Sequence, residues 1–437
     1  MNMSKFKPVR GMRDFLSKDA QKMRYVEQKA RELAQLYGYE EVITPVVESY
    51  ELLAAKAGEE IRLRMYTFND KAGRKVALRA EFTPSIARLI VTKMRTTPKP
   101  IKLFCVGTLY RYDEPQYGRF REFWQANYEL IGSNKPEADA EIITITSNLL
   151  QTLGLRNHYL KIGHMGILRG ILTQENVTEE QQNQMMQLLD KKRWNEALTM
   201  AQKLNLSNQG IQTLKTIFKT RGQKDTSNIL EKIKQNVKNY EDATAAAENL
   251  KEIIELTRNS GVKSNLLIEP GFARGLEYYT GAIFEAYVPG LKKVDPALGG
   301  GGRYDKLIEL FGGEPTPAVG VAPGIDRITL AIKKQKIQPK TEKQKTVVII
   351  PIKEEMRTRA FEVSTALREA GIITEVEVMR RKVSNALSDA DRRGFAFAVL
   401  IGPEEEKKGK AILRNMKKRE QKTIEIKKLA KEITKAT

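Results

Sequence analysis

The amino-acid sequence predicts an α+β protein, with an antiparallel sheet flanked by helices, a helical insertion, and a C-terminal α/β domain. Two apolar stretches around the turn sequence PQYG at 115–118 predict a β-hairpin. There is no proline between Pro136 and Pro270, and residues 165–260 are rich in Gln, Lys, Leu and Ala, which predicts helices. Strand and helix patterns alternate over residues 345–402, which predicts a mainly parallel sheet.

The N-terminal part is predicted to begin with an amphipathic helix. From Ser17 onward, apolar residues recur every three or four positions, and Gly38 can end the helix. Residues 40–48, EEVITPVVE, are then predicted to form a strand. Pro45 lies inside it, and a proline in a strand belongs at an edge or bend. This strand therefore suits a sheet margin or a contact between two copies of the chain.

A strand–helix unit and the hairpin come next. Residues 74–94 predict a strand followed by a helix, with Thr83 as the N-cap and Pro84 at the first helical position. Residues 102–114 and 119–132 supply the two strands of the hairpin.

Strand character returns at 265–288 and at 316–324, and a helix is predicted to follow the latter. A basic, polar linker then precedes the last domain. The predicted domain boundaries are 1–164 and 263–333 for the two parts of the sheet domain, 165–262 for the helical insertion, 334–344 for the linker, and 345–437 for the C-terminal domain.

The composition excludes several classes of site. A single cysteine, Cys105, rules out an internal disulfide and a cysteine zinc site, and two histidines leave little for a histidine-based metal site or a catalytic triad. The formal net charge of +21 favours a polyanionic partner, although a lysine-rich composition bias is an alternative. No apolar stretch is long enough to span a membrane, and the N-terminus lacks a signal peptide, so we expect a cytoplasmic protein.

Polar side chains alternate with apolar ones in the second hairpin strand. Gln125, Asn127 and Glu129 fall on one face with Arg121 and Phe123, opposite an apolar face. The polar face has three interpretations: a solvent-facing side, an interface, or the floor of a binding cleft.

Other segments carry similar groups, which favours the cleft. Arg79, Glu81 and Thr83 are predicted to share a face, and Arg111 ends the first hairpin strand. Arg274 opens another predicted strand. Carboxylates would hold an amine or an imidazole, and arginines would hold a carboxylate or a phosphate. Together they predict a site for a small zwitterion beside a phosphate.

Several motifs resemble those of class II aminoacyl-tRNA synthetases. Residues 109–132 resemble the second class signature, residues 316–332 the third, and residues 17–48 the first. ARGLEYYTG at 273–281 and GGRYD at 301–305 resemble more specifically the histidine-recognition motifs of histidyl-tRNA synthetases. The sequence at residues 111–127, within the second signature, is closer to the archaeal form than to the bacterial one, and the resemblance covers the whole chain.

This resemblance implies the class II synthetase fold with an anticodon-binding C-terminal domain, and an insertion that lies against the acceptor stem. It implies that histidine reacts with ATP, carried as its Mg²⁺ complex, to give histidyl-adenylate and pyrophosphate. The histidyl group then passes to the 3′ end of tRNA(His). No dedicated protein ligands for a metal are implied, and a homodimer is expected.

The resemblance also implies residues for ATP and for catalysis. Arg111 would contact the α-phosphate, Arg119 would help hold the phosphates, and Arg327 would lie along the γ-phosphate and adenine. Asp113, rather than Glu114, is favoured as the ATP-facing acid, with the choice left open. Arg274 would be the second catalytic arginine and would touch both the histidine carboxylate and the α-phosphate. Negative charge builds there in the transition state.

The histidine pocket is implied in the same way. Its predicted residues are Glu81 and Thr83 for the α-amino group with Gln125 beside them, Glu129 and Tyr279 for the two imidazole nitrogens, Tyr278 and Tyr304 to close the pocket, and Arg274 for the carboxylate. An alternative for Tyr278 and Tyr304 is that they only pack as aromatics. The glycines at 299–302 would let the backbone come close to the ligand, or would form only a flexible turn. The chain departs from the family pattern at Ala80, where proline is frequent, and at Glu277, where the shorter aspartate is frequent.

Two alternatives remain at this point. One is a non-catalytic paralogue, such as the regulatory subunit of ATP phosphoribosyltransferase, which keeps the fold but loses catalytic arginines. The other is an RNA-binding or polymerase-accessory protein without synthetase activity. Retention of Arg111, Arg274 and Arg327 favours the enzyme.

Overall fold

The computed structural model describes residues 6–55, 58–223, 226–274, 278–291, 296–338 and 345–435. The chain forms two compact units, Met1–Pro339 and Lys340–Thr437, which are treated separately below. Most of the predicted linker, residues 339–344, lies outside the described residues. Within the described part of the chain, no helix is long and apolar enough to cross a membrane.

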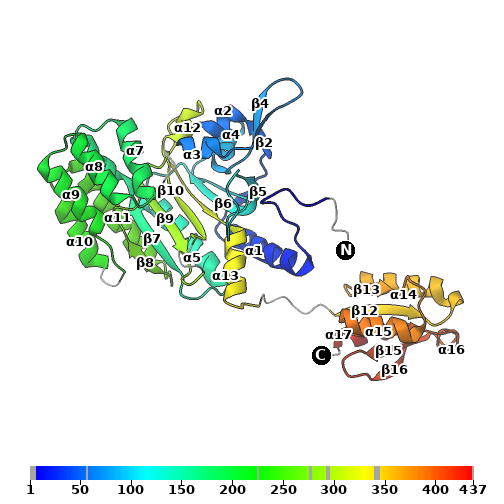
Figure 1. Cartoon of the computed structure of the whole chain (residues 1–437). Coiled ribbons are helices and arrows are strands. Elements are labelled where there is room, and N and C mark those ends of the chain that lie inside the picture. The colour runs from blue at the N-terminus through cyan, green and yellow to red at the C-terminus, as the bar shows by residue number, and fades with distance from the viewer. Residues whose placement is uncertain are drawn as a thin grey trace. The chain divides into compact units, whose positions relative to one another are not determined.

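An eight-stranded sheet organises the first unit (Figure 1). Its strands lie in the order β1 (Glu40–Glu41), β5 (Ile101–Tyr110), β6 (Glu122–Ile131), β11 (Ala318–Pro323), β10 (Gly299–Arg303), β9 (Ala282–Tyr287), β7 (Tyr159–His164) and β8 (Asn265–Ile268). The five inner pairings are antiparallel, and one parallel pairing lies at each edge, β1 with β5 and β7 with β8. The predicted hairpin is confirmed, with Tyr110 opposite Glu122.

Helices α1 (Ser17–Leu36), α5 (Pro136–Thr152) and α13 (Ile325–Lys334) pack against this sheet. The apolar face of β6, with Ala126, Tyr128 and Leu130, is buried in the main core. Because side chains alternate along a strand, Gln125, Asn127 and Glu129 project to the opposite face. That face carries the pocket described below.

A second, small sheet lies beside the hairpin and corrects two predictions. It consists of β2 (Val47–Ser49), β4 (Lys75–Leu78) and β3 (Thr67–Asn69), with helices α2 (Tyr50–Ala54), α3 (Gly58–Leu63) and α4 (Thr83–Lys93). The single strand predicted at 40–48 is wrong: β1 and β2 belong to different sheets, and Pro45 lies between them. Thr83 is the first residue of α4 rather than its N-cap, because its hydroxyl bonds to Glu129 instead.

Helices fill the chain between β7 and β8. Among the described residues these are α6 (Met165–Gln174), α7 (Glu179–Asp190), α8 (Trp194–Lys203), α9 (Asn208–Lys219), α10 (Thr226–Val237) and α11 (Glu241–Asn259). Figure 1 shows α7 to α10 gathered at the end of the unit away from α1. A short helix, α12 (Leu307–Leu310), follows β10. The helical character of the insertion is as predicted, whereas its boundaries as a domain stay a prediction.

The second unit has a five-stranded sheet in the order β13 (Ile373–Val376), β12 (Thr346–Pro351), β14 (Phe397–Ile401), β15 (Lys410–Asn415) and β16 (Gln421–Glu425). Its helices are α14 (Arg357–Glu369), α15 (Val383–Arg393), α16 (Pro403–Glu406) and α17 (Leu429–Lys435), with short 3₁₀ turns at Glu354–Met356 and Ile426–Lys428. The first three strands are parallel, but β15 and β16 are antiparallel. The sheet is therefore mixed rather than mainly parallel, because short connections after β14 allow antiparallel pairing.

Candidate active site

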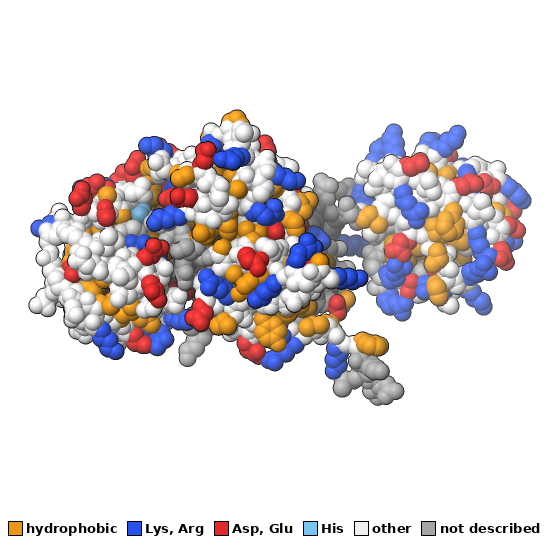
Figure 2. All heavy atoms as spheres, turned by 90° about the horizontal axis from the view of Figure 1, so that it is seen from above, with side chains coloured by type: hydrophobic (Ala, Val, Ile, Leu, Met, Phe, Trp, Pro, Cys, Tyr) orange, Lys and Arg blue, Asp and Glu red, His pale blue; other side chains and the backbone are white. Residues whose placement is uncertain are grey.

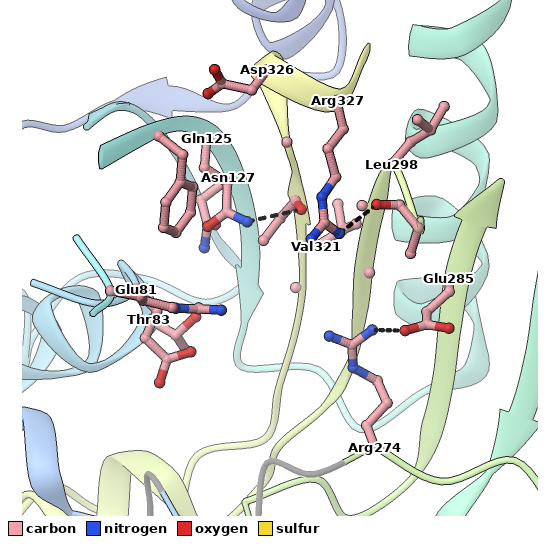
Figure 3. A pocket seen from close by; sticks show the side chains of 18 of the residues that line it. Glu81, Thr83, Gln125, Asn127, Arg274, Glu285, Leu298, Val321, Asp326 and Arg327 are labelled. Atoms are coloured by element: carbon pink, nitrogen blue, oxygen red, sulfur yellow. Dashed lines mark hydrogen bonds and ion pairs between the residues drawn. The ribbon is translucent and has the colours of Figure 1, made fainter. Parts of the chain in front are cut away.

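One open pocket, with about 1040 Å³ of empty space, lies on the polar face of the large sheet. It is lined by all the residues that the sequence assigned to ATP, histidine or catalysis: Glu81, Thr83, Arg111, Asp113, Arg119, Gln125, Glu129, Arg274, Tyr278, Tyr279, Tyr304 and Arg327. Figure 3 shows Glu81 and Thr83 across the pocket from Arg274, with Arg327 towards one end. Arg111 and Arg274 therefore meet in one cavity, while the role of each residue stays a prediction.

Glycines on the central strands create the space for these side chains. Gly299 to Gly302 form strand β10 in the middle of the sheet, not a flexible turn. A Cβ added at Gly300 would lie 2.0 Å from Nη1 of Arg274, and one added at Gly320 would lie 1.7 Å from Oε2 of Glu129. Only glycine at these positions leaves the arginine and the carboxylate where they are.

Glu129 is the most enclosed acid of the pocket, with 1% of its surface exposed. Thr83 Oγ1 donates to its Oε1 at 2.8 Å, Asn127 Nδ2 donates to the same oxygen at 2.7 Å, and the Tyr304 hydroxyl donates to Oε2. Burial raises the pKa of Glu129 to about 7, although these hydrogen bonds work in the opposite direction. Near neutral pH this group can therefore accept a proton or a hydrogen bond from a ligand.

Glu81 forms the second acidic position. The Tyr278 hydroxyl donates to its Oε2 at 3.0 Å, and its Oε1 is a buried oxygen without a hydrogen-bond partner among the described residues. Burial raises the pKa of this carboxyl, against the opposing effects of Arg111, Tyr278 and Arg274. An ammonium group beside Oε1 would supply the missing donor and favour the charged form.

Arg274 lies in the loop before β9 and is held by Glu285, a residue that the sequence analysis did not select. Arg274 Nη1 donates to Glu285 Oε1 at 2.9 Å. Burial alone would lower the pKa of Arg274, but Tyr279 and Glu285 raise it further than burial lowers it. The guanidinium is therefore a permanent positive charge at the edge of the cavity.

Two further arginines of the pocket are held by backbone carbonyl oxygens. Arg327 donates to the carbonyl oxygens of Gly118 at 2.8 Å and Ala297 at 2.7 Å, and Arg111 donates to that of Ala80 at 2.9 Å. Burial, with repulsion from Arg119 and Arg111, lowers the pKa of Arg327 to about 10. Arg327 and Arg111, held by backbone carbonyls, and Arg119, paired with Asp113, place three like charges in one pocket, which attracts a polyanion.

The two adjacent acids after Arg111 have different surroundings. Asp113 lines the pocket and pairs with Arg64 at 3.2 Å and Arg119 at 3.3 Å. The side chain of Glu114 is 72% exposed, pairs with Arg10, and does not line the pocket. The geometry thus favours Asp113 over Glu114 as the pocket-facing acid.

Some polar residues noted in the sequence lie elsewhere. Strand β4 ends at Leu78, so the alternation does not extend to Arg79, which instead donates to backbone oxygens of Thr44 and Thr108. Arg121 donates to the carbonyl of Asp113 and does not line the pocket. Glu277 lies outside the described residues.

Asp326 is a further pocket residue that the sequence analysis missed. It accepts a hydrogen bond from the Trp124 backbone amide at 2.6 Å and pairs with Arg13. An acid next to Arg327 at the start of a predicted helix was the available signal, since acids are favoured in a first helical turn. Within the described part of the chain, no group of three or more His, Cys, Asp or Glu side chains gathers as a metal site.

Comparison with known proteins identifies the family. A family model described as histidyl-tRNA synthetase matches residues 11–328, and one described as anticodon binding domain matches residues 346–436. A histidine–tRNA ligase from Methanocaldococcus jannaschii is 41% identical over 424 residues, which cover 96% of this chain and 98% of the relative.

Solved structures agree on the fold. The apo histidyl-tRNA synthetase of S. aureus is 26% identical with a TM-score of 0.71, and the match covers 98% of this chain and 99% of that one. A Bacillus halodurans structure, described as an ATP phosphoribosyltransferase regulatory subunit/histidyl-tRNA synthetase, is 24% identical with a TM-score of 0.74, covering 89% and 97%. By the family models and the archaeal relative, the chain belongs to the histidyl-tRNA synthetase family.

Proposed function

We propose that the pocket activates L-histidine with ATP, and that the chain then transfers the histidyl group to tRNA(His). The observation that carries this proposal is the division of charge within one cavity. Glu81 lies on one side (Figure 3), and Glu129, which accepts a hydrogen bond from Thr83, lines the same cavity. An amino group and an imidazole need such acceptors. Arg274 lies across from Glu81, and Arg111 and Arg327 line the same cavity, where a carboxylate and a triphosphate need cations.

In the activation step, a carboxylate oxygen of histidine attacks the α-phosphorus of ATP, and the bond from that phosphorus to the pyrophosphate oxygen breaks. Arg111 and Arg274 act on the two sides of the reacting phosphate. They bring two anions together and stabilise the charge that builds on the phosphoryl oxygens. Because both guanidiniums are anchored before substrate arrives, little reorganisation accompanies the reaction.

Arg119, Arg327 and Asp113 serve the nucleotide in this proposal. The three-arginine group formed by Arg111, Arg119 and Arg327 takes the phosphates, and Mg²⁺ arrives with ATP as part of the substrate. Asp113 keeps Arg119 oriented through their 3.3 Å contact. No residue of the chain is assigned as a direct metal ligand.

Selection of histidine rests on hydrogen bonds to both ring nitrogens. Glu129 accepts from one nitrogen and Tyr279 bonds the other, while Thr83 and Gln125 help Glu81 to hold the α-amino group. An amino acid that lacks these nitrogens would leave buried polar atoms unpaired, and such sites can discriminate by about 10⁴-fold or more. Tyr278 and Tyr304 fix the two carboxylates through the hydrogen bonds described above.

The second unit is proposed to bind the anticodon arm of tRNA(His). Its match to the anticodon-binding model and the net charge of +21 for the whole chain support this role. Figure 2 shows Lys and Arg side chains on several sides of this unit. We also propose a homodimer, because exposed apolar side chains occur near Pro45, with Ile43 93% and Val47 43% exposed.

The test of the function is amino-acid-dependent exchange of labelled pyrophosphate into ATP, followed by charging of tRNA(His). Exchange should require histidine among the standard amino acids, and charging should require tRNA(His). Absence of exchange with intact RNA binding would favour the non-catalytic alternatives. The fold alone does not separate a synthetase from a regulatory paralogue, but the presence of Arg111, Arg274 and Arg327 in one pocket favours the enzyme.

A further inference from the structure

A buried lysine lies on strand β7, beside the pocket residue Glu285. Lys161 has a side chain that is 10% exposed, and it is not one of the residues that line the pocket. Its Nζ lies 3.1 Å from Oε2 of Glu285 and 3.6 Å from the ring centre of Phe272. A charged ammonium is rarely buried without a partner, so this lysine needs an explanation.

The sheet register places Lys161 in line with the active site. Lys161 pairs across the strands with Glu285, and Glu285 pairs with Gly300. Cross-strand partners share one face of a sheet, so all three positions face the side on which Arg274 lies. The absent side chain at Gly300 is what admits the Arg274 guanidinium, as shown above.

Glu285 thus serves two cations with its two oxygens. Oε1 accepts from Arg274 at 2.9 Å, and Oε2 faces Lys161 at 3.1 Å and accepts from the Tyr287 hydroxyl. Burial alone would raise the pKa of Glu285, but Arg274 and Lys161 outweigh it and lower the pKa, so the carboxylate stays ionised. One negative and two positive charges leave a net charge of +1 in this buried group.

We propose that Lys161 is a positioning residue for histidine activation, which offsets the charge of Glu285 so that Glu285 can anchor Arg274 without neutralising it. With Lys161 absent, Arg274 and Glu285 would form a neutral pair, and the attraction for the histidine carboxylate and α-phosphate would fall. The proposal rests on the role of Arg274 given under the proposed function.

The experiment compares single and double variants by histidine-dependent pyrophosphate exchange. Lys161→Met should lower kcat by roughly tenfold to a hundredfold, as expected for removing one charge several ångströms from the reacting groups. Adding Glu285→Gln to it should recover part of the loss, because the net charge of the group returns to +1. Lys161→Arg should keep most of the activity. A role in packing alone predicts that the double variant is no better than Lys161→Met.

Lys102 provides a matched control. It lies on strand β5 of the same sheet, pairs with Glu141 at 2.8 Å, and does not line the pocket. Lys102→Met should leave exchange nearly unchanged, and an equal loss there would overturn the proposal, as would full activity of Lys161→Met. Should Lys161→Met fail to fold, Lys161→Gln replaces it, because glutamine has no charge but can still donate a hydrogen bond to Glu285. Its exchange activity is then compared with and without Glu285→Gln in the same way. If the wild-type chain itself shows no exchange, the proposed function fails rather than this inference.

Discussion

Replacement of Gly300 by alanine should displace Arg274 without harming the fold. The added Cβ would lie 2.0 Å from Nη1 and 2.8 Å from Cζ of Arg274. To reach an ordinary contact of 3.4 Å, the guanidinium must retreat by 3.4 − 2.0 = 1.4 Å. The atoms that clash belong to the end of a flexible side chain, so the movement costs the folded state little.

The same movement should be costly for catalysis. A misplacement of about 1 Å in a positioned group can lower a rate by about 100-fold. We therefore expect Gly300→Ala to lower kcat for histidine-dependent pyrophosphate exchange by roughly two orders of magnitude. The melting temperature and the affinity for tRNA(His) should stay close to those of the wild type.

The neighbouring glycine provides the contrast. A Cβ at Gly301 would lie 2.1 Å from the carbonyl oxygen of Gly320 and 2.8 Å from the Cα of Val321, which are backbone atoms that cannot swing aside. Gly301→Ala should therefore lower the stability of the first unit by about 1–3 kcal/mol or more. Full exchange activity in Gly300→Ala would refute the placement of Arg274 as the basis of catalysis, as would equal destabilisation in both variants.

Three further predictions concern the acids. Glu129→Gln should raise the KM for histidine by roughly tenfold to a hundredfold through loss of a charged hydrogen bond, with little change in the KM for ATP, and a defect confined to ATP would contradict the assignment. The pKa of Glu129 is raised from 4.5 to about 7 in the folded state. The neutral carboxyl therefore contributes fully to the free energy of unfolding below pH 4.5, and this contribution is lost as the pH rises through 7. In urea unfolding, Glu129→Gln should thus gain stability relative to the wild type between pH 5 and pH 8, and a constant difference would argue against this pKa. Asp113→Asn should slow exchange at low ATP much more than Glu114→Gln, and the reverse order would move the nucleotide-facing role to Glu114.

Much of the fold could be predicted because local patterns agreed with it. The alternation in residues 121–130 gave the correct faces of β6, since this strand is central and its two sides have different environments. The prediction at 40–48 failed because composition does not reveal that consecutive strands join different sheets. The C-terminal sheet was predicted as mainly parallel because the sequence pattern of its last two strands is weak, and their pairing is set by short connections.

The residues of the candidate site were also only partly predictable from the sequence. Residues inside recognisable motifs, such as Glu129 and Arg274, could be selected from the sequence. Glu285 could not, because its partners Lys161 and Arg274 come from distant segments, and only the strand register brings them together. Arg79 was misplaced because the strand ends before it, so that period-two counting no longer applied.

The central claim is that the Arg274 guanidinium acts on the reacting phosphate, and its most direct measurement is the exchange activity of Arg274→Ala beside its affinity for tRNA(His). The account predicts that pyrophosphate exchange falls by about 10²-fold or more, the range seen when a group that stabilises transition-state charge is removed, while the affinity for tRNA(His) is nearly unchanged. Equal losses in both quantities, or exchange at the wild-type rate, would contradict it.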